Sequence, residues 1–299
     1  WITQPIDHFG ANNGTWKQKY MVNAEHYKPG GPIYILTPGE SEVSKMYTED
    51  THFSKIVFVG GSYGGALAAW MRAIYPDLVT AAWASSAPVF TYIDFYQLDQ
   101  ALGRHLTARG CGESFAQGVK DLDAILLSNN SSGLDSVRKM FSVTGNTAQD
   151  IAASITGAIT STVNLPVMLS GDALDQSDSN ITAYRSELVD REYWQGGCRS
   201  SFGPDMHPLT DVTEQNRKWL GLLKGVTNIY YTVGELDPWR DTTVATANGT
   251  LLDNTTSAPI FVMNGATHTQ DMQPDTLYDL NSVRMAKEMG DSLIKKWIL

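Results

Sequence analysis

Three residues of this chain have the types and the order that nucleophilic acyl transfer requires: Ser62, Asp237 and His268. A serine hydroxyl becomes a strong nucleophile when a histidine takes its proton, and a carboxylate orients that histidine. Ser62 lies in the Gly-x-Ser-x-Gly motif that runs from Gly60 to Gly64. This motif is typical of a strained strand-to-helix turn that exposes the serine oxygen.

The elements on both sides of Ser62 fit such a turn. Ile56 to Val59 is an apolar run that predicts a buried strand. Apolar residues then recur at helical spacing until Pro76, namely Leu67, Trp70, Met71 and Ile74. The glycines of the motif remove Cβ atoms where helix and strand cross closely. The backbone N–H of Tyr63 then lies at a helix N-terminus, where it can hold an oxyanion.

The acid and the base each follow a predicted strand and its terminal glycine. Asp237 comes three residues after the run Asn228 to Gly234, and His268 three residues after Ala258 to Gly265. Serine, acid and histidine follow one another in this order along α/β-hydrolase chains. Asp237 also precedes a proline, a common turn pairing. Three other acidic residues compete for its role: Glu235, Asp241 and, near the histidine, Asp271.

A second oxyanion donor normally comes from the loop after an earlier strand. Ile33 to Leu36 predicts such a strand, and the loop Thr37 to Ser41 follows it. We therefore expect the second donor near Gly39. The alternative is an ordinary Pro-Gly turn with no role in catalysis.

Further along the chain, strands alternate with helices. Leu78 to Val89 predicts another strand, and the last helix should run from Ser282 to Ile298. The pattern predicts a mostly parallel sheet with helices on both faces.

In the middle of the chain, roughly residues 91 to 191, apolar residues recur at helical spacing. One predicted face holds Phe115, Val119, Leu122 and Leu126, and another holds Ile151, Ile155, Ile159 and Val163. The sequence thus predicts a catalytic domain of residues 1–90 and 192–299, with a helical cap inserted at residues 91–191.

Composition excludes several classes of function. The 299-residue chain is 42% hydrophobic and 18% charged, and its net charge of −10 argues against a nucleic-acid partner. There is no phosphate-binding loop and no zinc-type spacing, so we expect no cofactor and no metal. No apolar run reaches the roughly 18 residues of a membrane helix. The chain begins at Trp1, as expected of a processed or shortened protein.

Six Asn-x-Ser/Thr triplets favour a secreted or lysosomal/vacuolar glycoprotein; their asparagines are Asn13, Asn129, Asn130, Asn180, Asn248 and Asn254. The two cysteines, Cys111 and Cys198, could pair with each other, but spacing does not decide this. Oligomeric state is equally open.

Several stretches of the chain resemble the prolyl-specific serine carboxypeptidase family, which includes lysosomal Pro-X carboxypeptidase, dipeptidyl peptidase II and fungal secreted prolyl endopeptidases. The matching stretches are QPIDHFGANNGTWKQKY, GGPIYILTPGE, VGGSYGGALAAWMRAIYPDLVTAAWASSAPV, EYWQGGCRSSF, GELDPWRD and NGATHTQDM. The resemblance implies an α/β-hydrolase core with a helical cap. It also implies hydrolysis on the carboxyl side of proline, so the expected partner is a proline-containing peptide.

The resemblance assigns the nucleophile, acid and base to the same three residues. It implies that Trp239 helps to wall the proline pocket, unless that ring only packs in the core. Glu40 would meet a substrate amine in members that remove dipeptides. Tyr193, Trp194 and Cys198 are expected to support structure. Carboxypeptidase, dipeptidyl peptidase and endopeptidase activities all remain open.

The chain departs from the family between Leu36 and Ile56. Family members carry a strand and a helix there, whereas this chain has about twenty residues, too few for a strand and two helical connections. Either the chain from Glu40 to Phe53 is truly short, or the printed sequence omits residues of the full protein. Two other functions also stay open: a lipase or esterase with the same triad, and a binding protein with an inactive site.

Overall fold

The computed structural model describes residues 1–6, 13–22, 31, 33–37, 55–108, 110–128, 130–155, 186, 188–189, 191–206 and 211–299. Its centre is a five-stranded parallel sheet in the order β3-β4-β5-β6-β9. These strands are β3 (Ile33–Leu36), β4 (Ile56–Gly61), β5 (Val79–Ser85), β6 (Ile229–Gly234) and β9 (Ile260–Met263). Every strand that the sequence predicted is therefore present, and the predicted mostly parallel sheet is confirmed.

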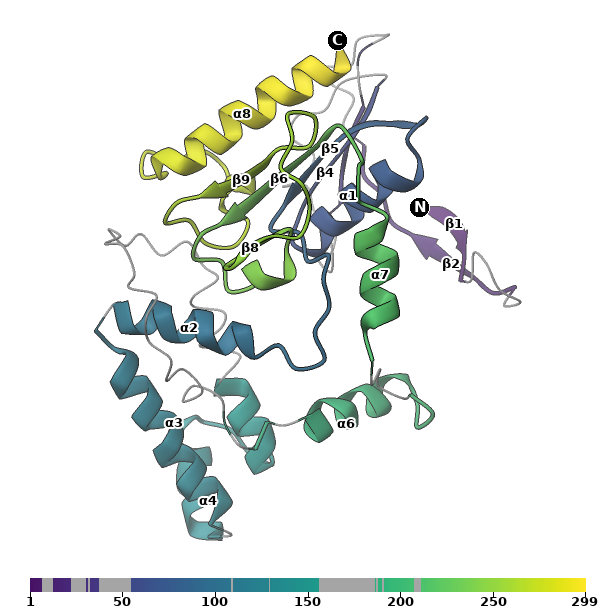
Figure 1. Cartoon of the computed structure of the whole chain (residues 1–299). Coiled ribbons are helices and arrows are strands. Elements are labelled where there is room, and N and C mark those ends of the chain that lie inside the picture. Colours follow the sequence, from purple (N-terminus) through teal and green to yellow (C-terminus); the bar gives the residue numbers. More distant parts are fainter. Residues whose placement is uncertain are drawn as a thin grey trace.

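Two helices cover opposite faces of the sheet: α1 (Tyr63–Ile74) and α8 (Asn281–Ile298) (Figure 1). Alternate strand residues face each of them, as the two-residue period of a strand requires. Phe58 packs with the alanines of α1, whereas its neighbour Val57 packs with Ile294 of α8. Gly290 lets α8 approach β5, because a Cβ there would lie 2.5 Å from the ring of Trp83.

The predicted strand Leu78 to Val89 is shorter in the structure and ends at Ser85. The reason is local, because Ser86 has a φ of 47° and cannot continue an extended strand. A hydrogen bond to a neighbouring strand also holds the turn at Ser86. The N–H of Ser86 donates to the carbonyl of Thr232 at 2.7 Å, and this bond holds the chain after β5 against β6.

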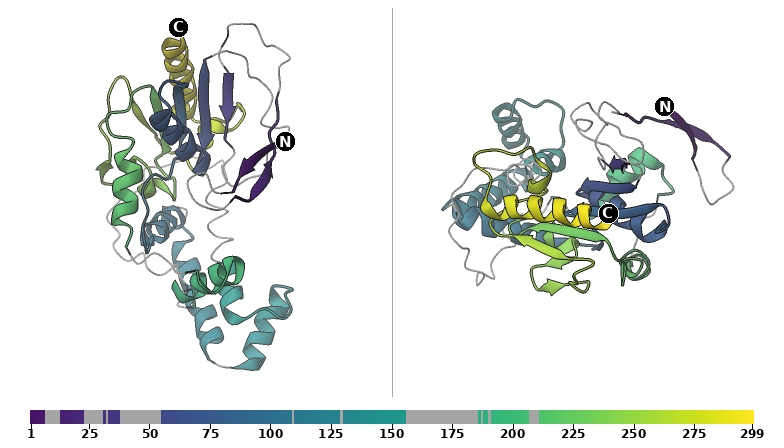
Figure 2. Two further views of the ribbon diagram at one scale, coloured as in Figure 1. Left: turned by 90° about the vertical axis from the view of Figure 1, so that its right-hand side faces the viewer. Right: turned by 90° about the horizontal axis from the view of Figure 1, so that it is seen from above.

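The middle of the chain is helical, as expected, with α2 (Tyr96–Ala108), α3 (Gly112–Leu127), α4 (Ser131–Met140) and a helix over residues 148–155. These helices lie together at the end of the molecule away from the C-terminus (Figures 1 and 2). The buried cluster of α3, α4 and the helix over residues 148–155 includes Leu126, Val137 and Ile151. Of the second predicted face, Ile159 and Val163 lie outside the described residues.

The next helix, α6 (Arg191–Phe202), contacts this helical cluster through Tyr193, whose hydroxyl donates to Asp150 at 3.2 Å. The predicted boundary at residue 191 would place α6 in the catalytic domain, so the division into domains stays a prediction. Trp194 is exposed, and Cys111 and Cys198 are both free thiols.

Several elements had no clear signal in the sequence: β1 (Ile2–Pro5), β2 (Thr15–Gln18), α7 (Thr213–Gly221), η3 (Arg240–Thr242), β7 (Ala245–Thr246), β8 (Gly249–Thr250) and η4 (Gln270–Met272). β1 and β2 form an antiparallel hairpin that projects from the body of the molecule (Figure 2). Within the described part of the chain, no helix is long and apolar enough to cross a bilayer.

Candidate active site

The nucleophile candidate, Ser62, lies between β4 and α1 with φ 56° and ψ −132°. Such a conformation is strained for a non-glycine residue and persists only where its surroundings hold it. The N–H of Ser62 donates to the carbonyl of Ser85 at 2.9 Å, and its own carbonyl accepts from Gly65 and Ala66 in the first turn of α1. The structure therefore has the strand–turn–helix elbow that the motif predicts.

Glycines make this elbow possible. A Cβ on Gly60 would collide with the backbone of Gly64 and would lie 2.6 Å from the Oγ1 of Thr37. A Cβ on Gly65 would lie 2.8 Å from the carbonyl oxygen of Ser85. Helix α1 thus starts in direct contact with the ends of β4 and β5, where larger residues would not fit.

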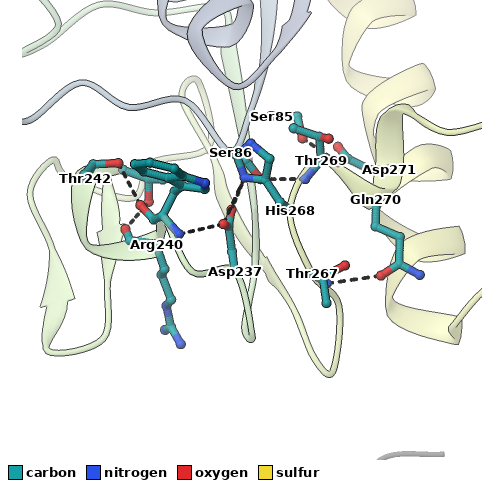
Figure 3. Close-up of polar contacts among 12 residues, drawn as sticks. Ser85, Ser86, Asp237, Arg240, Thr242, Thr267, His268, Thr269, Gln270 and Asp271 are labelled. Atoms are coloured by element: carbon teal, nitrogen blue, oxygen red, sulfur yellow. Dashed lines mark hydrogen bonds and ion pairs between the residues drawn. The ribbon is translucent and has the colours of Figure 1, made fainter. Parts of the chain in front are cut away.

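The base and the acid candidates meet in the structure. The Nδ1 of His268 lies 2.9 and 3.0 Å from the two carboxylate oxygens of Asp237 (Figure 3). The Asp237 side chain is fully buried, whereas 13% of the His268 side chain is exposed. The carboxylate can therefore orient the imidazole and stabilise its charged form, and the other ring nitrogen is left for a hydroxyl or a substrate.

A second bond fixes Asp237 itself. The backbone N–H of Trp239 donates to Asp237 Oδ1 at 2.9 Å, which is the side-chain-to-backbone turn expected of an Asp-Pro sequence. The Asp237 carboxylate therefore accepts the hydrogen bond of the turn and also pairs with His268.

The competing carboxylates are used elsewhere. Glu235 accepts the N–H of Gly265 at 2.8 Å, and Asp241 accepts the N–H of Ala247 at 2.8 Å. The Glu235 bond joins the loop after β6 to the loop after β9, and the Asp241 bond lies within the segment after β6. Asp237 is therefore the carboxylate of this loop that reaches the histidine.

Asp271 is also turned away from His268 and lies in the core. Its carboxylate accepts the hydroxyls of Ser85 and Thr232 at 2.5 Å each and the indole N–H of Trp83 at 3.1 Å. Burial raises the pKa of Asp271, while these donors act in the opposite direction. The sequence gives no local signal for the partners of Asp271, because they are 39 to 188 residues away along the chain.

The histidine loop lies against the elbow. A Cβ on Gly61, the residue before the serine, would lie 2.9 Å from the side chain of Thr269, the residue after the histidine. Thr269 has a φ of 50°, and its N–H donates to the hydroxyl of Ser86 at 3.0 Å (Figure 3). Ser62 and His268 are thus carried by segments that touch each other at the ends of the central strands.

The expected oxyanion loop is described only at its start. Thr37 follows β3, and its hydroxyl donates to the carbonyl of Gly64 at 2.7 Å, so the loop begins against the elbow. Tyr63 is the first residue of α1, as predicted. Gly39 and Glu40 lie outside the described residues, as does the short connection as far as residue 54.

The remaining predicted residues are placed as follows. Trp239 stacks on Phe95 with ring centroids 5.7 Å apart, and Phe95 stacks on Tyr92, so Trp239 belongs to an aromatic row beside the acid. Asn13, Asn130, Asn248 and Asn254 are exposed, whereas Asn129 and Asn180 lie outside the described residues. No group of three or more potential metal ligands occurs in the described residues.

Comparison with known proteins gives several curated relatives. K12H4.7 of Caenorhabditis elegans is 26% identical over 216 residues, which is 50% of this chain and 41% of that protein. The Lysosomal Pro-X carboxypeptidase of Bos taurus is 26% identical over 165 residues, 33% of each chain. The chain therefore spans less than half the length of these two relatives.

The Lysosomal Pro-X carboxypeptidase of Mus musculus is 21% identical over 446 residues, and that alignment covers 100% of this chain and 89% of the mouse protein. Because the alignment is longer than the 299-residue chain, the mouse protein has long segments without a counterpart here.

The family model described as Serine carboxypeptidase S28 matches residues 4–55, 43–184 and 173–290. The first two matched segments overlap at residues 43–55, in the connection before β4. Together the three segments cover most of the sequence. The chain therefore belongs to the Serine carboxypeptidase S28 family.

Proposed function

We propose that this protein is a serine peptidase that hydrolyses peptide bonds on the carboxyl side of proline, with Ser62 as nucleophile, His268 as base and Asp237 as acid. The observation that carries the proposal is the bond between His268 Nδ1 and the buried carboxylate of Asp237, at 2.9 Å, in a loop that contacts the serine elbow. Family membership supports the peptidase chemistry, and the names of the Pro-X relatives support proline.

The mechanism follows from these positions. His268 accepts the Ser62 proton as the serine oxygen attacks the substrate carbonyl, and Asp237 stabilises the imidazolium that forms. The N–H of Tyr63, with a second donor near Gly39, holds the oxyanion. His268 then gives the proton to the leaving amine. Water hydrolyses the acyl-enzyme by the same steps in reverse, and the serine regains its proton.

Proline selectivity would come from the aromatic row beside the acid. Trp239 follows Asp237 by two residues and stacks on Phe95, so the flat apolar rings follow directly after the acid. A proline ring is compact and apolar, so such a wall suits it. We also propose a secreted or lysosomal location and glycosylation of the predicted asparagines, in keeping with the lysosomal relatives.

The first test is labelling by a serine-reactive fluorophosphonate, followed by turnover of proline peptides blocked at both ends, free at the N-terminus or free at the C-terminus. We expect the protein to be labelled and to cleave after proline. Ser62→Ala should abolish labelling and lower kcat by about a millionfold. The preferred peptide then distinguishes endopeptidase, dipeptidyl peptidase and carboxypeptidase.

Other results would contradict the proposal in different ways. Labelling with turnover of fatty esters but not of peptides would indicate an esterase. Absence of labelling in a folded protein would indicate a binding protein with an inactive site. A Ser62→Ala variant that keeps full activity would remove Ser62 as the nucleophile.

A further inference from the structure

Asp271 is a buried carboxylate that the proposed mechanism does not use. Only 4% of the residue is exposed, and it lies three residues after His268. Taking an ionised carboxylate out of water is costly unless donors surround it. Here three donors do so, from Ser85, Thr232 and Trp83. These donors belong to β5 and β6, so one side chain joins the histidine loop to two central strands.

Ser85 connects this carboxylate to the nucleophile. Its hydroxyl donates to Asp271 Oδ1 at 2.5 Å, and its carbonyl accepts the N–H of Ser62 at 2.9 Å. The path from the elbow to the histidine loop therefore runs from Ser62 through Ser85 to Asp271. The adjacent bond from the Thr269 N–H to the Ser86 hydroxyl holds the same loop to the end of β5 (Figure 3).

A separate set of bonds holds the acid and base loops together. The N–H of Glu235 donates to the carbonyl of Met263, and the N–H of Leu236 donates to that of Ala266, both at 2.9 Å. The carboxylate of Glu235 accepts the N–H of Gly265 at 2.8 Å. None of these bonds involves Asp271, so the loops that carry Asp237 and His268 are joined by hydrogen bonds other than its own.

We propose that Asp271 is a positioning residue that fixes His268 relative to Ser62, by way of Ser85, while the Glu235 bonds independently fix His268 on Asp237. The inference rests on the proposed function, because it takes Ser62 as the nucleophile and His268 as its base. Short hydrogen bonds in a dry site are directional, which suits them to hold two segments at a defined separation. A misplacement of about 1 Å between reacting groups costs roughly a hundredfold in rate.

The test compares Asp271→Asn, Ser85→Ala and the double variant with the unchanged protein. The readouts are the second-order rate of fluorophosphonate labelling, the kcat and KM for a proline peptide, and the low-field NMR signal of the His268 Nδ1 proton. We expect each single variant to lower the labelling rate and kcat by about tenfold to a hundredfold, with KM nearly unchanged. The double variant should lose no more labelling rate or kcat than the more impaired single variant, because both substitutions break the same connection. The low-field signal should persist in all three.

Asp123→Asn is the matched control. Asp123 is also a buried carboxylate that accepts a serine hydroxyl at 2.5 Å, from Ser186, but it lies in the helical segment on α3. This variant should lose stability without a change in the labelling rate of the folded protein. If Asp271→Asn does not fold, Ser85→Ala alone is enough to test the inference. In that variant the Asp271 carboxylate keeps its bonds to Thr232 and Trp83.

Three results would overturn the inference. Unchanged labelling rates would show that the connection does not position the serine and histidine. Fully multiplicative losses in the double variant would show that the two residues act separately. Loss of the low-field signal would show that Asp271 supports the pair of His268 and Asp237 instead. Failure of the proposed function is a distinct outcome, because the unchanged protein itself would then not be labelled at Ser62.

Discussion

At the scale of single residues, several strained backbone conformations lie at the candidate active site. Three of the five non-glycine residues with positive φ in the described part of the chain, Ser62, Ser86 and Thr269, lie at the carboxyl ends of the central strands or in the loop against them. The other two are Ser142, after α4, and Asn228, before β6. A non-glycine residue with positive φ costs on the order of 1–3 kcal/mol and needs compensation. Hydrogen bonds from Ser62 to the carbonyl of Ser85 and from Thr269 to the hydroxyl of Ser86 supply it.

Asp271 also allows a prediction about pH. Burial raises its pKa in the folded protein above that in the unfolded chain, although the Ser85 and Thr232 hydroxyls oppose this. Between these two pKa values the folded state binds more protons than the unfolded state. The contribution of Asp271 to the free energy of unfolding is therefore most favourable at acid pH, and it is lost as pH rises through the raised pKa.

The measurement is urea unfolding of the unchanged protein and of Asp271→Asn across a pH series from acid to neutral. The asparagine side chain has a similar shape but no titratable proton, so the variant lacks this dependence. We expect the unchanged protein to lose stability relative to the variant as pH rises. A stability difference that stays constant across the series would show that Asp271 does not titrate in the folded protein.

At the scale of elements, glycines decide which segments can touch. Gly234 ends β6, and a Cβ there would collide with the carbonyl of Thr267 and lie 2.5 Å from that of Ala266. Both carbonyls belong to the loop that carries His268. The acid loop after β6 and the base loop after β9 therefore meet backbone to backbone, which brings Asp237 within hydrogen-bond distance of His268.

Gly234→Ala should separate these loops. We expect it to lower the free energy of unfolding by about 1–3 kcal/mol, because the backbone must move to admit a methyl group. It should also reduce fluorophosphonate labelling, because the bond between His268 and Asp237 would lengthen. Thermal unfolding and labelling rates measure the two effects.

Gly118→Ala is the control for this prediction. Gly118 lies inside α3, and a Cβ there would have no atom within 4 Å. Alanine in a helix interior is favoured over glycine by about 0.5–1 kcal/mol, so this variant should be more stable and equally reactive. Equal effects of the two substitutions would contradict the role given to Gly234.

At the scale of the whole molecule, buried residues form separate clusters. The cluster between the sheet and α1 includes Phe58, Ala82 and Tyr231, whereas a different cluster holds α3, α4 and the helix at 148–155 together. All but one residue of β5 and all of β6 are buried, while most of α3 is not. The sheet should therefore be the most stable unit.

Hydrogen exchange tests this expectation. Amides of β5 and β6 should exchange only on global unfolding. Amides of α3 and α4 should exchange through a smaller opening whose free energy is lower by roughly 2 kcal/mol or more. Native-state exchange at rising urea concentration separates the two routes. One opening free energy for all of these amides would show a single cooperative unit and would contradict the predicted helical cap.

The sequence by itself determined the features that depend on neighbouring residues. Apolar runs and glycines predicted every strand of the sheet, the elbow at Ser62, and the segments that carry Asp237 and His268, because strand period and turn chemistry are local properties. The sequence did not predict the β1–β2 hairpin, whose exposed residues lack a buried, alternating face.

Only the tertiary structure decided which of several carboxylates meets His268. The position of Asp237 after a strand and its glycine favours it over Glu235 and Asp241, but all three lie within seven residues, and only the folded chain shows which carboxylate reaches His268. Asp271 is closer to His268 in sequence, yet its carboxylate bonds to Ser85, 186 residues earlier. Such contacts arise where strands that are distant in the chain lie side by side in the sheet, as β5 and β6 do. The partners of a carboxylate then come from remote parts of the chain, and no short stretch of sequence contains them.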